Sequence, residues 1–255
     1  MIDSHCHLTY SPLYDQIDAV LARAAAAGVS ACVTIGTSIE DTRRAIALTA
    51  AKQGVHPTAG VHPHEAGKAA EGWDRDLESL ARLPEVVAVG ETGLDYHYDF
   101  SDRAAQQRVF ERELEIAVAV GKPVIIHCRE GHADTLAELK SFPRPDRVVF
   151  HCFTGTVAEA REILDRGHWL SLTGVVTFKK SDELREVARL LPADRIMVET
   201  DSPYLTPEPI RSVKPNEPAH VAHTLRCMAA IRGMSFDDLD TLSTANTKTF
   251  FALTE

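Results

Sequence analysis

The sequence has little cysteine, few aromatic residues and no long apolar run. Its five cysteines, at positions 6, 32, 128, 152 and 227, include no CxxC pair, so we expect a reducing compartment and no disulfide scaffold. No stretch approaches the roughly 18 apolar residues of a membrane-spanning helix. Asp3, His5 and His7 stand where a signal peptide would carry its apolar run. We therefore expect a cytoplasmic protein with no membrane partner.

Positive charge is also scarce. The chain has 27 Lys and Arg against 37 Asp and Glu, a formal net charge of −10 at pH 7. This balance excludes a basic clamp that holds nucleic acid over the whole molecular surface. It leaves room for a nucleic-acid substrate handled locally, because bound divalent cations are often the largest charges in a site.

What the sequence does contain is a regular alternation of short β-branched runs and longer segments of helical period. The strand candidates span residues 1–5, 31–36, 57–62, 86–91, 123–127, 147–151, 168–174 and 195–201. Helical segments are expected at residues 15–28, 101–121, 134–142, 156–167 and 181–191. Eight such alternations predict parallel strands closed into an α/β (β/α)8 TIM barrel.

The end of the chain and its length complete the fold prediction. From about Ala219 onward the sequence has helical character only, so extra C-terminal helices are expected after the last strand. No linker, low-complexity segment or break in composition divides the 255 residues. We therefore predict a single domain over residues 1–255, a usual length for one barrel.

Histidines and carboxylates collect at the ends of the predicted strands. In strand order these residues are His5 and His7, His62, Glu91, His127, His151 and Asp201. Active sites of (β/α)8 barrels lie at the carboxyl ends of the strands, so the topology predicts that these residues meet at one rim.

The first pair, His5 and His7, stands at positions i and i+2. In a strand this spacing places both imidazoles on one face, with Cys6 on the other. Alone the pattern is weak, because an HxH sequence also fits a polar strand. Together with the other strand ends it predicts two ligands to one cation.

The whole set consists of four imidazoles (5, 7, 127 and 151) and two carboxylates (91 and 201). Nitrogen and oxygen ligands suit zinc, manganese, iron or a related divalent ion. Six ligands are too many for one four-coordinate zinc. A binuclear site with a bridging water as nucleophile accounts for the number, with Glu91, central in strand order, as the bridge.

Eight motifs in order resemble the TatD-like metal-dependent hydrolases of the amidohydrolase superfamily. They are IDSHCHL, GVHPH, GETGLDYHYDFSDRAAQQRVFERELEIA, KPVIIHCRE, HCFTG, SLTGVVTFKK, ETDSPYLTPEP and NEPAHV. They run from residue 2 to about residue 221, followed by a family-like TANTKTFF. The resemblance implies a TIM-barrel phosphodiesterase, specifically a 3'-5' exonuclease-like deoxyribonuclease that acts on DNA or a small phosphodiester.

The resemblance also implies roles for single residues. His5, His7 and Asp201 would hold one metal, His127 and His151 the other, and Glu91 would bridge the two. Asp201 would also act as the general base toward the attacking water. The resemblance further implies substrate contacts, which would come from His62, His64, Arg129, Glu199 and Arg211. Two divalent ions are expected, and zinc, manganese, magnesium, iron, cobalt and nickel are all compatible with the ligands.

One segment departs from the family pattern. The family commonly carries a basic Arg-Gly-Lys-Arg-Asn-like run after the Asp-Ser-Pro motif, whereas this chain has PIRSVKPNEP. The glycine is missing, the spacing between Arg211 and Asn216 is longer by one residue, and Pro215 directly precedes the asparagine. Arg211 and Lys214 preserve the positive charge.

Other interpretations remain open at this point. The same binuclear chemistry attacks carbonyl groups, so an esterase or amidase, such as a D-aminoacyl-tRNA deacylase, is the alternative function. The acidic composition and the 6% of aromatic residues favour this alternative slightly. A metal-binding protein without activity is the third interpretation. No obligate protein partner is expected, and a monomer is compatible with the sequence.

Overall fold

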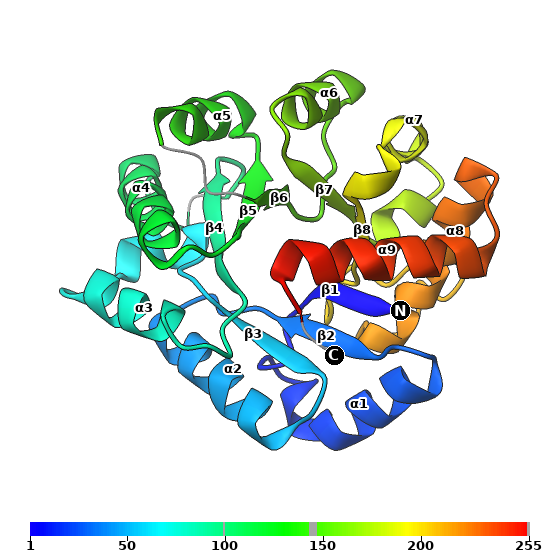
Figure 1. Ribbon diagram of the computed structural model, residues 1–255, viewed down its shortest axis with the longest axis horizontal. Helices are drawn as coiled ribbons and strands as arrows, with labels where there is room; N and C mark the ends of the chain where they lie inside the picture. The colour runs from blue at the N-terminus through cyan, green and yellow to red at the C-terminus, as the bar shows by residue number, and fades with distance from the viewer. Residues whose placement is uncertain (99, 143–146, 254–255) are drawn as a thin grey trace. The chain divides into compact units, whose positions relative to one another are not determined.

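Strands and helices alternate along residues 1–98, 100–142 and 147–253, the parts of the chain that the computed structural model describes (Figure 1). The chain folds into two compact units. The first unit is formed by Met1–Thr34 and Cys152–Glu255, and the second by Ile35–His151.

The second unit is a parallel sheet covered by helices. Its strands are β3 (Val55–Ala59), β4 (Ala88–Asp95), β5 (Val124–Arg129) and β6 (Val148–Phe150). Its helices are α2 (Ile39–Ala51), α3 (Trp73–Ala81), α4 (Arg103–Val120), α5 (His132–Ser141) and the 3-10 segment Pro63–Lys68. Strand β4 pairs with β3 and β5, and β5 pairs with β6, always in parallel. Helices α2 to α5 lie along the outer side of these strands (Figure 1).

The longest helix of the second unit, α4, shows why the sequence folds this way. Its N-cap Asp102 accepts a hydrogen bond from the Ala105 N–H at 2.8 Å, and it ends at Gly121, whose φ of 68° favours glycine. Val109 and Ala105 on its buried face pack against Val61, next to His62. The helix therefore supports the segment that carries two of the predicted site residues.

The first unit contains the two ends of the chain. Its elements before residue 35 are β1 (Ile2–Cys6), the 3-10 turn Tyr14–Gln16, α1 (Ile17–Ala26) and β2 (Ala31–Thr34). The later elements are α6 (Val157–Asp165), β7 (Trp169–Leu172), α7 (Asp182–Leu190), β8 (Ile196–Val198), α8 (Val221–Arg232), α9 (Phe236–Phe251) and the 3-10 turns Gly174–Thr177, Ala193–Arg195 and Pro218–His220. Strand β1 pairs with β2 and β7 with β8, in parallel. Helices α7, α8 and α9 pack in sequence order (Figure 1).

Eight strand-and-helix alternations with parallel pairing confirm the predicted (β/α)8 barrel fold class, and α8 and α9 are the predicted extra C-terminal helices. Several boundaries differ from the prediction. Strand β4 continues to Asp95, so Glu91 lies within the strand and not at its end. Strands β3, β6 and β8 end before His62, His151 and Asp201, which lie in the segments that follow. Helices α2 and α3 are not among the predicted segments.

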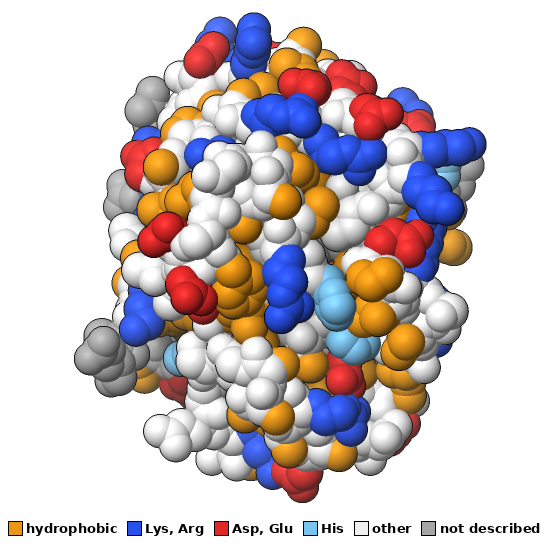
Figure 2. Space-filling model, turned by 90° about the vertical axis from the view of Figure 1, so that its right-hand side faces the viewer, with side chains coloured by type: hydrophobic (Ala, Val, Ile, Leu, Met, Phe, Trp, Pro, Cys, Tyr) orange, Lys and Arg blue, Asp and Glu red, His pale blue; other side chains and the backbone are white. Residues whose placement is uncertain are grey.

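On the face drawn in Figure 2, basic and acidic side chains are interspersed. None of the described helices is both long enough and apolar enough to cross a membrane.

A buried carboxyl group in α4 connects the segment after β3 to strand β4. Glu113 is fully buried; its Oε1 accepts from the Val61 N–H at 2.8 Å and its Oε2 from the Thr92 hydroxyl at 2.5 Å. Val61 directly precedes His62 in the sequence, and Thr92 directly follows Glu91. Burial raises the pKa of Glu113 well above its ordinary value, because the charged form is desolvated.

We expect Glu113→Gln to preserve both hydrogen bonds and to remove this titration. Because the pKa is raised in the folded state, the native protein holds the proton more tightly than the unfolded chain, and its stability falls as pH rises above the ordinary carboxyl pKa. Urea unfolding should show a free energy of unfolding that declines less between pH 5 and pH 8 in the Gln variant. Glu113→Ala should lose about 1–3 kcal/mol at pH 5, since it leaves a buried N–H unsatisfied. Equal pH slopes for wild type and Glu113→Gln would contradict this account.

Candidate functional site

Three imidazoles of the second unit converge on one carboxylate oxygen, Oε1 of Glu91. His151 Nε2 lies 2.7 Å from it, His127 Nδ1 2.9 Å and His62 Nε2 3.3 Å. The Glu91 side chain is only 2% exposed. His127 is in β5, and the other two histidines follow β3 and β6. Since these strands are parallel, the segments after them meet at the same edge of the sheet.

A second carboxylate, Asp95, faces the opposite side of His127. Its Oδ2 lies 3.0 Å from His127 Nε2 and 2.8 Å from His64 Nε2, while its Oδ1 accepts from the N–H groups of His97 and Tyr98 at 3.0 Å each. Burial alone would raise the pKa of Asp95, but the hydrogen bonds from His127 and His64 outweigh it and lower the pKa. Asp95 is therefore held as a carboxylate between two imidazoles.

The protonation of the histidines follows from the same contacts. Burial lowers the pKa of His62 to about 4, although Glu91 attracts its proton, so this ring is neutral near pH 7. Burial also disfavours the charged form of His127, but its hydrogen bonds to Asp95 and Glu91 outweigh this effect and raise its pKa. A neutral imidazole offers the lone pair that a metal ion requires.

The first unit brings His5, His7 and Asp201 together. Asp201 Oδ1 lies 3.2 Å from His7 Nε2 and 3.7 Å from His5 Nε2, and the two rings are 5.2 Å apart. Backbone hydrogen bonds run from the Asp201 N–H to the His5 carbonyl at 3.0 Å and from the His7 N–H to the Ser202 carbonyl at 2.7 Å. Cys6, between the two histidines, is buried with its thiol 3.4 Å from the Val33 carbonyl. The end of β1 is thus tied to the segment that follows β8.

Two further side chains fix the segment around Asp201. Asp3 accepts from the N–H and the hydroxyl of Thr200 at 2.9 and 2.5 Å, and burial raises the pKa of Asp3 to about 8. The Asn216 amide donates to the carbonyls of Thr200 and Tyr204 at 3.0 and 2.6 Å. Asp201 itself has a φ of 53°, a left-handed conformation that aspartate tolerates better than most residues.

The hydrogen bonds of Asn216 bear on the departure of this segment from the family pattern. Pro215 directly precedes Asn216, yet the asparagine is fully buried and hydrogen-bonded to the segment after β8. Lys214 Nζ lies 3.4 Å from the Thr206 hydroxyl, and the Arg211 guanidinium stacks 3.6 Å from the centre of the Phe178 ring. The altered segment therefore retains the asparagine that supports Asp201, while its two basic side chains have local contacts.

Glu199 and Arg129 occupy different environments. Glu199 is buried, and its carboxylate accepts from the Cys152 N–H at 2.6 Å and from the Ser171 hydroxyl at 2.5 Å. The Arg129 side chain is exposed, with its guanidinium 4.8 Å from the centre of the Tyr98 ring. Contacts of these two residues with substrate stay predictions, as do those of His62, His64 and Arg211.

The donor atoms in each unit suit a divalent cation. In the set His5, His7 and Asp201, and in the set His62, Glu91 and His127, all ligand atoms lie within 4.8 Å of one another. Imidazole nitrogen and carboxylate oxygen are the donors that zinc, manganese and iron accept. Because His127 Nδ1 faces Glu91, its Nε2–H can donate to Asp95, the arrangement usual for a metal-binding histidine.

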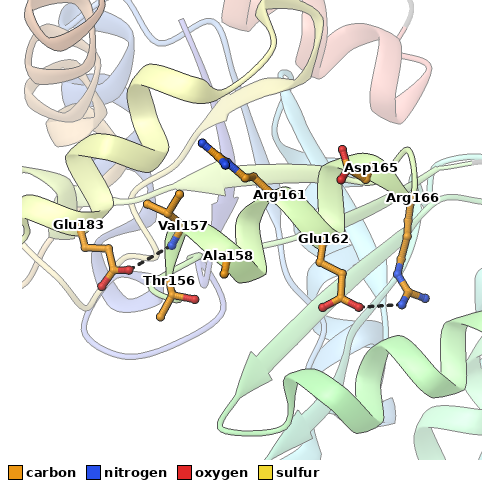
Figure 3. A pocket seen from close by; sticks show the side chains of 8 residues that line it. All are labelled: Thr156, Val157, Ala158, Arg161, Glu162, Asp165, Arg166 and Glu183. Carbon is orange, nitrogen blue, oxygen red and sulfur yellow. Dashed lines mark hydrogen bonds and ion pairs between the residues drawn. The ribbon is translucent and has the colours of Figure 1, made fainter.

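A shallow pocket of the first unit lies elsewhere. It has a volume of about 840 Å³ and is lined by α6 and by Glu183 of α7 (Figure 3). In this pocket Glu183 accepts from the Val157 N–H at 3.2 Å, and Glu162 pairs with Arg166 at 2.8 Å (Figure 3). None of its lining residues is a predicted site residue, and two of its charged side chains, Glu162 and Arg166, already pair with each other. The presence of a pocket therefore does not by itself identify the functional site in this unit.

Sequence reasoning missed Asp95, and a signal for it was present. Glu91 and Asp95 stand at positions i and i+4, which share one face of a strand. The prediction ended the strand at Glu91, so Asp95 fell into a loop. A strand continued through GETGLD would have placed both carboxylates beside the histidines.

We expect Asp95→Asn to weaken divalent-metal binding about 10- to 100-fold, because it removes the carboxylate that orients His127. Calorimetric titration of chelator-treated protein with zinc or manganese measures the dissociation constant. The matched control is Asp76→Asn, which changes an exposed carboxylate paired with Arg43. An unchanged dissociation constant in Asp95→Asn, or an equal loss in the control, would show that Asp95 has no such role.

Comparison with solved structures gives matches over the whole chain. The protein YjjV from Escherichia coli K12, described as a TatD homologue, superposes with a TM-score of 0.94 at 29% identity, covering 100% of this chain and 98% of that one. A hydrolase of the TatD family from Entamoeba histolytica superposes with a TM-score of 0.89 at 26% identity, covering 98% and 97%.

Sequence comparison agrees with this result. A 3'-5' ssDNA/RNA exonuclease TatD from Citrobacter koseri is 40% identical over 260 residues, 99% of each chain. The uncharacterized metal-dependent hydrolase YcfH of Escherichia coli K12 is 40% identical over 251 residues, 96% of this chain and 93% of the other. The family model described as TatD related DNase matches residues 2–252. As the motifs predicted, the chain belongs to the family of TatD-related DNases.

Proposed function

We propose that this protein is a divalent-metal-dependent nuclease that hydrolyses phosphodiester bonds in single-stranded nucleic acid. The observation that carries the proposal is the convergence of imidazole nitrogens on a single carboxylate oxygen in each unit, Oε1 of Glu91 and Oδ1 of Asp201. Two relatives of about the same length are named as an exonuclease and as a metal-dependent hydrolase. The first name supports cleavage of single-stranded nucleic acid, and the second supports a metal-dependent hydrolysis.

We assign the metal ligands from these contacts. His5, His7 and Asp201 hold one divalent ion, and Glu91, His127 and His151 hold a second. When bound, such ions supply the Lewis acidity that activates water and neutralises charge on the phosphoryl group. That Glu91 bridges the two ions stays a prediction. Its position among three imidazoles supports a role for Glu91 as a central ligand.

Asp201 is the proposed general base. Its side chain is 15% exposed, whereas that of Glu91 is 2% exposed, so water from solvent reaches Asp201 more readily. Its backbone N–H donates to the His5 carbonyl, and Asp3 and Asn216 bind the preceding residue, Thr200, which fixes the direction of the carboxylate. A positioned base of this kind typically contributes about 10²- to 10⁴-fold to the rate.

The substrate side is proposed to include His64 and Arg129. The His64 side chain is 25% exposed, compared with 13% for His62, although both belong to the same motif. Arg129 presents a guanidinium at the surface, where bidentate donation to a phosphate is favourable. His62, with its lowered pKa and its contact to Glu91, acts as a neutral partner nearer the metal. Glu199 and Arg211 are proposed to act at the edge of the substrate site in the first unit.

The alternative functions have less support. The relatives are named as exonucleases and metal-dependent hydrolases, which does not favour an aminoacyl-ester deacylase. An inactive metal-binding protein would not need a partly exposed Asp201 held so firmly. We also propose that residues 1–255 form one hydrolase domain, because the family model runs through both units. The cytoplasmic location and the monomeric state stay predictions.

We expect cleavage of single-stranded DNA that chelation abolishes and that added manganese, zinc or magnesium restores. Asp201→Asn should lower kcat about 10²- to 10⁴-fold, because the base is lost. The rate is measured on a 3'-labelled and a 5'-labelled oligonucleotide, which also distinguishes direction of attack.

The matched control for this experiment is Asp182→Asn, since Asp182 is 91% exposed in the same unit and pairs with Arg185. It should cleave at the wild-type rate. An Asp201→Asn variant within twofold of wild type would rule out the general-base role. Turnover of an aminoacyl ester without any cleavage of DNA or RNA would favour the deacylase.

A further inference from the structure

Two aromatic side chains of the second unit are unusually exposed. Tyr98 is 40% and Phe100 64% exposed, although aromatic residues make up only 6% of the chain. Their rings are stacked, with centroids 5.4 Å apart and an interplanar angle of 23°. Single exposed apolar residues are common and need no explanation, but two stacked rings hold one another in place and leave an outer aromatic face open to solvent. We call Tyr98 and Phe100 the aromatic platform.

The platform is connected to the Asp95 carboxylate through the His64 ring. The edge-on His64 ring lies 4.8 Å from Phe100 and 5.6 Å from Tyr98. Its Nε2 contacts Asp95 at 2.8 Å, and the same carboxylate accepts from the Tyr98 N–H. One buried carboxylate therefore fixes both the imidazole ligand cluster and the base of the platform. A molecule lying on these rings would lie beside His64, whose ring centroid is 6.0 Å from that of His127.

A positive charge stands beside the platform. The Arg129 guanidinium lies 4.8 Å from the centre of the Tyr98 ring, and its side chain is exposed. Among the residues that the structure describes, no carboxylate lies within ion-pair distance of it. The neighbouring basic group, His97, is already paired with Glu130 at 2.7 Å. The surface thus combines a flat apolar face with one available cation.

We propose that Tyr98 and Phe100 are a stacking platform for a nucleobase of the substrate strand, with Arg129 contacting a phosphate next to that base. This inference rests on the proposed nuclease function and names the substrate feature that the site recognises. Stacking on an aromatic side chain is worth about 5- to 150-fold in affinity per base and tolerates any base. It requires an unpaired base, so the platform selects single strands.

The size of the platform favours a base over a protein partner. One aromatic side chain buries about 150–250 Å². Two of them fall short of the roughly 800 Å² per partner that a stable protein interface buries. A nucleobase, by contrast, has the flat shape and the area of a single ring system.

The test compares an intact single-stranded DNA oligonucleotide with a series of oligonucleotides of the same sequence. Each member of the series carries one abasic site, placed one nucleotide further from the cleaved end than in the member before. The ratio of the kcat/KM of the intact oligonucleotide to that of each member measures the contribution of the missing base. For wild type we expect a ratio of about 5 to 150 at one position. Phe100→Leu and Tyr98→Leu should bring it toward one, while the aromatic variants Phe100→Tyr and Tyr98→Phe should keep it. Tyr14→Leu is the matched control, since Tyr14 is 42% exposed in the first unit.

Binding of the same oligonucleotides, followed by fluorescence anisotropy in chelator, separates this inference from the proposed function. If wild type cleaves none of these oligonucleotides, the nuclease proposal fails, and the anisotropy ratio alone decides on the platform. A ratio that Phe100→Leu and Tyr98→Leu leave unchanged would overturn the stacking proposal. Self-association of wild type that Phe100→Leu abolishes in sedimentation would overturn it as well, because the rings would then contact a second copy.

Discussion

The second unit depends on a single electrostatic constraint: Glu91 is buried with three imidazole nitrogens between 2.7 and 3.3 Å from one of its oxygens. A buried carboxylate is costly unless positive charge or hydrogen-bond donors compensate it. Protons on the imidazoles or a divalent ion can both supply that compensation. Without such compensation the buried carboxylate would destabilise the fold, whereas a bound divalent ion would stabilise it.

The same principle orders the residues behind this carboxylate. Asp95 occupies the far side of His127, and the buried Glu113 holds the segments next to His62 and Glu91. In the first unit, Asp3 and Asn216 support Asp201 in a similar way: Asp3 accepts from the Thr200 hydroxyl, and Asn216 donates to the Thr200 carbonyl. Each proposed ligand group thus has its own support, and loss of a supporting residue would act through geometry.

Much of this could be predicted from the sequence. The eight alternations gave the fold class, and the i, i+2 spacing of His5 and His7 placed two imidazoles together. Glycines in GETGLD, which weaken a strand prediction, concealed the length of β4. The structure explains one of them: a Cβ on Gly93, whose φ is 128°, would collide with the His127 carbonyl of the neighbouring strand. The stacked, exposed rings of Tyr98 and Phe100 depend on tertiary packing, which periodicity does not reveal.

The central claim is that the two groups of imidazoles and carboxylates bind divalent metal. A crystal structure of manganese- or zinc-loaded protein, with anomalous scattering recorded at the metal edge, tests it most directly. The account predicts one anomalous peak beside His5, His7 and Asp201 and another beside Glu91, His127 and His151. Saturating metal with no peak at either group, or peaks only at surface carboxylates, would contradict it.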